Sequence, residues 1–148
     1  MAAVYGTLTP GSIMDADLSA GANLDPLKMR HQYAPTYGQP LSAATSETRV
    51  LHVVKGATGS IVAFRAGSVT IAAGAATVTV DLKKNGTTCL QAVITLDSAN
   101  VAYTLEEAVL TVTALAAGDV LTITTVATAG GGTLPTGFFC EAVVREDP

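Results

Sequence analysis

Two histidines and two cysteines are the side chains of this sequence best suited to acid–base or nucleophilic chemistry. His31 lies in a proline-rich stretch, where a fixed catalytic geometry is hard to hold. Cys89 or Cys140 could pair with His52, because a Cys/His pair is brought together by the fold and not by sequence spacing. Neither cysteine lies in a nucleophile-elbow or cysteine-protease signature. We therefore expect that the protein is not an enzyme.

His52 lies inside the apolar segment 49–54. Alternation along an extended strand places it on the same face as Val50 and Val54. It is then either a hydrogen-bonded histidine of a core or interface, or a histidine that points outward.

No set of residues has the spacing of a metal or phosphate site. Asp15 and Asp17 could start a calcium loop, but the acidic ligands and the glycine that should follow are missing. Glu106 and Glu107 are adjacent and point to opposite faces of a strand, which indicates solvated charges or protection of a strand edge. Gly130–Gly132 is not followed by Lys and Ser or Thr, so it is no phosphate loop. We expect no cofactor and no metal.

Two cysteines are too few for a disulfide framework. The simplest interpretation is that Cys89 and Cys140 are small buried hydrophobic residues of neighbouring strands. A disulfide between them stays open at this stage, since it depends on whether those strands are adjacent.

The charge of the chain argues against two classes of partner, nucleic acids and membranes. The chain has 148 residues and a net charge of −4, and its eight basic residues are scattered, with Lys83–Lys84 the one adjacent pair. Nucleic acid and anionic membranes need clustered Lys and Arg, so we expect binding to neither. No apolar run reaches the length of a membrane-spanning helix, and the first residues lack the pattern of a signal peptide.

The elements that must position these side chains are strands. Ala, Thr and Val number 25, 21 and 16, and Val and Thr favour strands. From residue 48 onward, short apolar or alternating runs are separated by turn residues, and no capped helix is visible. The expected strands are 49–54, 59–65, 75–84, 87–96, 101–105, 108–114, 120–126 and 138–145. About eight strands at this spacing predict an all-β fold, an antiparallel, jelly-roll-like β-sandwich over residues 46–148.

Two turns are expected to organise the strands. Asn85 and Gly86 accept the positive φ of a type I′ hairpin turn, and this hairpin places Leu82 opposite Cys89 and Val80 opposite Gln91. Gly118 and Asp119 make the turn before segment 120–126.

Residues 1–45 differ from the rest of the chain, because they hold four of the six prolines and show no periodicity. We predict an extended N-terminal arm with apolar anchors at Leu27, Met29, Tyr33 and Tyr37, which could pack along the surface of a partner. The alternatives are that the arm folds back on its own domain or is mobile.

Segments 78–90, 94–96 and 115–123 resemble tailed-phage capsid decoration proteins, also called cement or head-stabilising proteins. The shared pattern is a strand running into Lys-Asn-Gly, a return strand, and a Gly-Asp-Val turn into a late strand; it covers about residues 48–145. The Gly-Asp turn also occurs in trimeric jelly rolls of the C1q and tumour-necrosis-factor type.

The resemblance implies a structural virion protein without enzymatic activity. It would be made in the host cytoplasm and would sit on the outer surface of a bacteriophage capsid. It would bind there as a homotrimer and stabilise the shell by bridging neighbouring subunits of the major capsid protein.

The alternative function is a receptor- or glycan-binding module of a phage head fibre or tail. Such a module presents aromatic rings at one end of the sandwich, and Phe138 and Phe139 beside the Gly-rich loop are the candidates. Adjacent residues of a strand face opposite sides, so at least one of the two should belong to the core.

Overall fold

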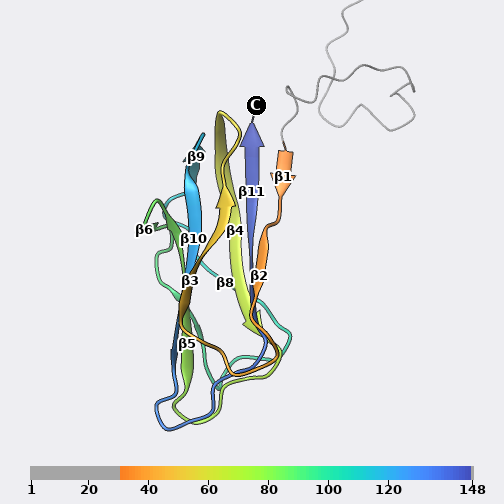
Figure 1. Ribbon diagram of the computed structural model, residues 1–148, viewed down its shortest axis with the longest axis vertical. Coiled ribbons are helices and arrows are strands. Elements are labelled where there is room, and N and C mark those ends of the chain that lie inside the picture. The colour runs from red at the N-terminus through yellow and green to blue at the C-terminus, as the bar shows by residue number, and fades with distance from the viewer. Residues whose placement is uncertain (1–30, 148) are drawn as a thin grey trace, which may run out of the picture.

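The computed structural model describes residues 31–147, which form eleven strands (Figure 1). They are β1 (His31–Tyr33), β2 (Thr36–Gly38), β3 (Glu47–Val53), β4 (Thr58–Ser68), β5 (Thr77–Lys84), β6 (Thr87–Thr88), β7 (Ile94–Leu96), β8 (Glu106–Glu107), β9 (Ala114–Ala116), β10 (Val120–Thr128) and β11 (Phe138–Asp147).

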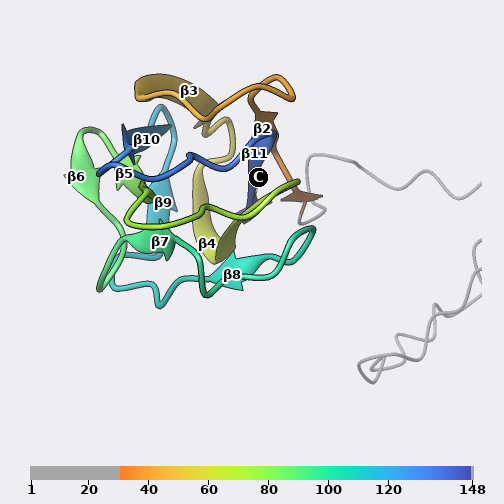
Figure 2. The ribbon, with the colours of Figure 1, turned by 90° about the horizontal axis from the view of Figure 1, so that it is seen from below.

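The strands build two antiparallel sheets that pack face to face (Figure 2). In the first, the β11 sheet, β11 and β4 form the centre, β1 and β2 line one edge, and β8 and β9 line the other. In the second, the β10 sheet, the order is β3-β10-β5, with β6 and β7 both on the far edge of β5. The predicted all-β antiparallel sandwich is confirmed.

The order in which the chain connects the strands is that of a jelly roll. β1 and β2, β6 and β7, and β8 and β9 are broken halves that share one neighbour each, so the eleven strands reduce to about eight. Apart from the β5–β6 hairpin, the chain passes from one sheet to the other at every step, which is the pattern of a double-sheet jelly roll.

The first described residues belong to the β11 sheet. Tyr33 pairs with Val144 and Thr36 with Glu141, so the register continues unbroken past Pro35. Pro35 has no N–H, so it interrupts the ladder and separates β1 from β2. Its carbonyl still accepts a hydrogen bond from the amide of Ala142 (3.0 Å). Residues 31–38 therefore fold back on their own domain, and the boundary expected at residue 45 is placed too late.

The β5–β6 hairpin has the predicted turn. Asn85 and Gly86 have φ of 50° and 87°, and the amide of Cys89 donates to the carbonyl of Leu82 (2.8 Å) as expected. The return strand is not continuous, however: β6 ends at Thr88, and Val80 pairs with Ile94 of β7 instead of Gln91.

The residues between β6 and β7 leave the sheet because they have partners elsewhere. Leu90 forms a bridge with Leu110, and the amide of Gln91 donates to the carbonyl of Val109 (2.9 Å). This cross-connection also explains why segment 108–114 is mostly a loop and not the expected strand, with β9 beginning only at Ala114.

The strand expected over residues 101–105 is a turn. Side-chain oxygens of Asp97 and Asn100 accept backbone amides (Ala99 at 2.7 Å and Asp97 at 2.5 Å), and such local bonds compete with a strand ladder. Tyr103 has φ of 60°, which is outside the β region.

The core lies between the two sheets and comes from alternating residues of the long strands. Along β5, Val78, Val80 and Leu82 are fully buried, as the alternation predicts. They meet large side chains of the facing sheet, among them Phe64 of β4 and Phe138 of β11. Thr125 is a buried polar residue of β10, and its hydroxyl donates to the carbonyl of Thr45 (3.0 Å).

Candidate functional site

A cluster of His52, Glu146 and Tyr33 joins β3, an edge strand of the β10 sheet, to β11 and β1 of the other sheet. A β-bulge in β3 places His52 opposite buried Leu121, while Val50 lies opposite Thr122. The alternation that grouped His52 with Val50 is therefore wrong, and His52 faces the interior. Its Nε2 donates to Glu146 Oε1 (2.5 Å), and the ring of Tyr33 lies 5.7 Å from its ring.

Glu146 is the centre of this cluster. Its side chain is 3% exposed, and its Oε2 accepts the backbone amides of Lys55 (3.0 Å) and Gly56 (2.8 Å). Burial alone would raise the pKa of Glu146, but the hydrogen bonds from His52, Gly56 and Lys55 hold that pKa below its ordinary value. All of these contacts hold the turn after β3 to the end of β11. We interpret the cluster as structural because its hydrogen bonds join these two segments.

A second polar cluster connects the predicted arm to β3. The hydroxyl of Tyr37 and the Nε2 of Gln39 both donate to Glu47 Oε1 (2.5 Å each), and Nε of Arg49 donates to Glu47 Oε2 (2.7 Å). The hydrogen bond from Tyr37 lowers the pKa of Glu47, and burial together with Glu47 raises the pKa of Tyr37. Tyr33 and Tyr37, two of the four arm anchors, thus contact the chain's own sandwich.

The two predicted turns form one unit. Asn85 Nδ2 donates to Asp119 Oδ1 (2.7 Å), and Asn85 Oδ1 accepts the amide of Val120 (2.9 Å). Asp119 Oδ2 accepts the amide of Ala116 (2.9 Å) and lies 3.6 Å from Lys84 Nζ. The hydrogen bonds from Ala116 and Asn85 lower the pKa of Asp119, and Gly118 has the positive φ (84°) that the turn needs.

Cys89 and Cys140 are both buried free thiols. Cys140 lies in β11 and Cys89 follows β6, so they belong to different sheets and not to neighbouring strands. Burial raises the pKa of Cys140 to about 12 and also raises that of Cys89. A thiolate nucleophile is therefore disfavoured at both positions.

The outer face of the β10 sheet is formed by Thr and Val. Val50, Val53 and Val126 are 63%, 45% and 49% exposed, and register places Val50 beside Thr122 and Val53 beside Val120. The remaining members alternate with buried residues along β10 and β5, or pair with such a member from β3: Thr48, Thr77, Thr79, Asp81, Lys83 and Thr124. Asp81 and Lys83 lie 3.9 Å apart, so this surface, the Thr/Val face, has no net charge.

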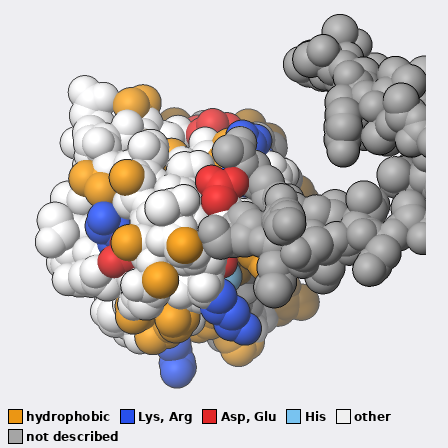
Figure 3. Space-filling view, turned by 90° about the horizontal axis from the view of Figure 1, so that it is seen from above, with side chains coloured by type: hydrophobic (Ala, Val, Ile, Leu, Met, Phe, Trp, Pro, Cys, Tyr) orange, Lys and Arg blue, Asp and Glu red, His pale blue; other side chains and the backbone are white. Residues whose placement is uncertain are grey.

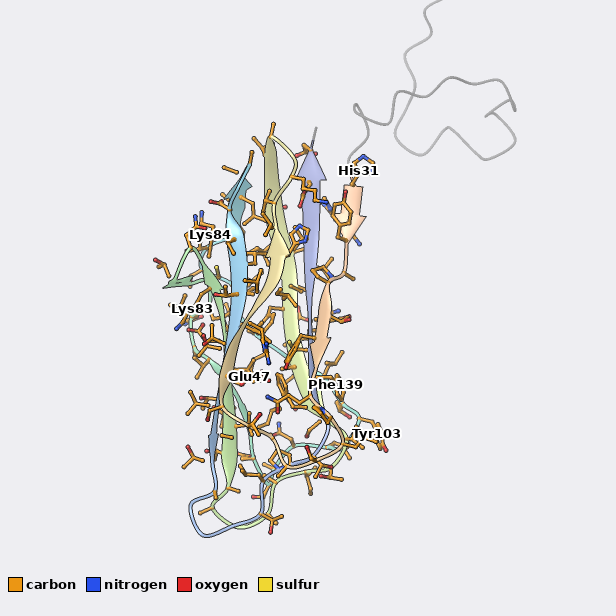
Figure 4. The ribbon with its side chains drawn as sticks, in the orientation of Figure 1. His31, Glu47, Lys83, Lys84, Tyr103 and Phe139 are labelled. Atoms are coloured by element: carbon orange, nitrogen blue, oxygen red, sulfur yellow. The ribbon has the colours of Figure 1, made fainter. Side chains whose placement is uncertain are left out.

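The outer face of the β11 sheet carries a shallow pocket of about 390 Å³. Thr36 and Gly38 of β2, Phe139 and Glu141 of β11, and Leu105 line it. Phe138 is buried, as expected for at least one of the adjacent pair, and Phe139 faces outward. Figure 4 shows Phe139 and Tyr103 at the same end of the domain. Sequence reasoning missed Gly38, Glu141 and Leu105, because their grouping depends on the pairing of β2 with β11.

Charged groups are dispersed on the end of the domain where β1 begins, as Figure 3 shows in the small separate groups of red and blue atoms. Within residues 31–147, no group of three His, Cys, Asp or Glu side chains is placed to hold a metal ion. The same residues include no helix long and apolar enough to cross a membrane. Asp15, Asp17, Leu27 and Met29 lie outside the described residues.

No protein-family model matches the chain. A search of curated proteins finds no matching relative.

Proposed function

We propose that the chain is a structural virion protein of a tailed phage. It binds the outside of the capsid as a homotrimer and stabilises the shell by bridging neighbouring subunits of the major capsid protein. It is made in the host cytoplasm and resides on the outer surface of the virion.

The observation that carries the proposal is the Thr/Val face. Three valines stay roughly half exposed or more on it, and its one close charge pair, Asp81 with Lys83, is internally neutral. β-branched side chains lose little conformational freedom on burial, and a flat neutral sheet face can pack against copies of itself without unpaired charges. We assign the contacts between copies to this face.

The resemblance to decoration proteins is the second support. Its three segments correspond to β5–β6, β7 and the turn from β9 into β10. The first and the third meet in the Asn85–Asp119 unit, and β7 pairs with β5. The contact with coat subunits is assigned to the residues before His31, among them Leu27 and Met29, because Tyr33 and Tyr37 are used within the domain.

The first experiment is light scattering on a sizing column with the full chain. We expect a mass three times the 14.9 kDa of the chain. The double variant Val50→Lys with Thr124→Lys should give a monomer, because it places like charges across the contact. Val62→Lys is the matched control, since Val62 is 42% exposed on β4 of the other sheet and should leave the trimer intact.

The second experiment is co-sedimentation with capsid shells formed by the major capsid protein of the same genome. The full chain should bind, and a chain beginning at His31 should remain a trimer but lose binding. A truncation at residue 48 is unsuitable because it removes β1 and β2 from the sheet. A monodisperse monomer without affinity for the shell would contradict the proposal.

A further inference from the structure

We infer that the pocket beside Phe139 binds one ring of a saccharide. The pocket lies on the outer face of the β11 sheet, opposite in the sandwich to the Thr/Val face. The inference therefore does not depend on the proposed function, and a monomer or a trimer could carry the site.

The hollow exists because Phe139 lies between two glycines. Register places Gly38 on one side of it and Gly67 on the other. A Cβ added to Gly67 would lie 3.1 Å from Phe139 Cζ and 2.4 Å from the carbonyl oxygen of Thr104. The ring thus leans over Gly67 and leaves the space above Gly38 open. Its volume of about 390 Å³ is within the range of small-molecule sites.

Next to Phe139, the pocket is lined by the charged side chain of Glu141. Glu141 of β11 pairs with Thr36 of β2, two residues along from the pair of Phe139 with Gly38 and on the same face. Arg65 Nη1 donates to Glu141 Oε1 (3.1 Å), while Arg65 Nε donates to Glu107 (2.7 Å). Within residues 31–147, no hydrogen bond is made to Glu141 Oε2. The carboxylate is therefore held in place with one oxygen ready to accept.

A pyranose ring has the matching chemistry, an apolar CH face and a rim of hydroxyl groups. Phe139 and Leu105 supply the apolar contact, and Glu141 accepts from hydroxyls. Arg65 offsets part of the charge of Glu141 but is shared with Glu107, so a small cation is the competing ligand class that the test includes.

Tyr103 extends the site for a longer saccharide. It is 74% exposed, and it is fixed at φ of 60° while its amide donates to the carbonyl of Ser68 (2.9 Å). A bulky residue held in this strained region is a sign of function, and a rigid aromatic side chain binds at low entropic cost. Leu105, two residues later, lines the pocket itself.

The test is a ¹H–¹⁵N NMR titration of the full chain with tetrasaccharides of glucose, mannose, galactose and N-acetylglucosamine. At least one should bind with a dissociation constant on the order of 1 mM. The amides that shift should be those of residues 36–38, 103–105 and 139–141.

Three variants locate the site. Gly38→Val fills the hollow, because a Cβ at Gly38 meets only ordinary contacts at 3.5 and 3.9 Å, and it should weaken binding at least about tenfold. Phe139→Ala and Glu141→Gln should do the same, so the test survives if one variant fails to fold. Ile71→Ala removes an exposed apolar side chain (44% exposed) that does not line the pocket, and binding should be unchanged.

Three results would overturn the inference. One is the absence of binding by all four tetrasaccharides. Another is binding that shifts amides outside the pocket and that is unchanged in the Gly38→Val variant. The third is binding of tetramethylammonium to the pocket while every saccharide is inert, which would identify a cation site.

Discussion

Asn85 and Asp119 belong to two turns separated by 34 positions, and their side chains are joined by a hydrogen bond of 2.7 Å. Asn85 adds a second link, because its Oδ1 accepts the amide of Val120 and its own amide donates to the carbonyl of Val120 (both 2.9 Å). The hairpin of β5 and the start of β10 are thereby fixed to each other. Each turn residue has two tasks, one in its own turn and one in the other.

Substitutions at Asn85 should separate these two tasks. Asn85→Gly keeps the positive φ and loses the side-chain hydrogen bonds, so we expect a loss of about 1 kcal/mol in the free energy of unfolding. Asn85→Ala also strains the backbone at φ of 50° and should lose about 2–3 kcal/mol. Urea denaturation checks both values. Equal losses of unfolding free energy in the two variants would show that the positive φ at position 85 does not contribute to the cost of Asn85→Ala.

Glu146→Gln should change how stability depends on pH. The folded-state pKa of Glu146 is lowered, so its ionised form stabilises the fold above the ordinary Glu pKa of about 4.3. This stabilisation is lost as the pH falls through the folded-state pKa. The variant should be about 2–3 kcal/mol less stable at pH 7 and should lose less stability than wild type on acidification.

Thermal unfolding between about pH 3 and about pH 7, which lie on either side of the ordinary Glu pKa of about 4.3, measures this difference. Glu107→Gln is the control, because Glu107 is half exposed on a strand edge. An unchanged acid slope in Glu146→Gln would contradict the assignment.

Neither cysteine should react with a thiol reagent while the protein is folded. Both thiols are buried, and the pKa of Cys140 is raised to about 12. In denaturant, titration with dithionitrobenzoate should find both thiols free. Rapid labelling of either thiol in the native state would contradict the burial, and the absence of both thiols in denaturant would indicate a disulfide between them.

The Gly-rich loop offers a matched pair of substitutions. Gly131 has φ of 82° and no atom within 4 Å of an added Cβ, so Gly131→Ala should cost only the backbone strain of about 1 kcal/mol. A Cβ at Gly132 would lie 2.1 Å from the carbonyl oxygen of Ala73. Gly132→Ala should therefore cost clearly more, because the backbone has to move. Chemical denaturation of both variants decides whether the order holds.

Local patterns predicted the parts of the fold whose partners are close in sequence. The alternation of Val78, Val80 and Leu82 fixed the inner face of β5, and Asn85–Gly86 fixed its turn. The pattern failed where a distant segment decides the conformation. Leu90 leaves the ladder because Leu110 pairs with it, and a bulge next to Val50 reverses the face of His52.

The site was harder to predict for the same reason. Proline normally argues against a strand, so Pro35 hid the strand in this segment from sequence reasoning. The register of Tyr33 and Thr36 on β11 is nevertheless continuous. Tyr33 and Tyr37 were identified as anchors from their spacing, but nothing local tells whether the surface they pack on is a partner or their own domain. Glu146 and His52 are 94 positions apart, and no short pattern links them.

The pairing of His31 with Glu146 places the first described residue beside the end of the chain. A short linker from the C-terminus to His31 could therefore close the backbone into a ring, and new ends could be opened at an exposed turn such as Asn85–Gly86. The same proximity makes this end of the domain the natural point for fusing a cargo. A fused protein would begin at this end of the domain and leave the opposite end, where Tyr103 lies, unobstructed (Figure 4).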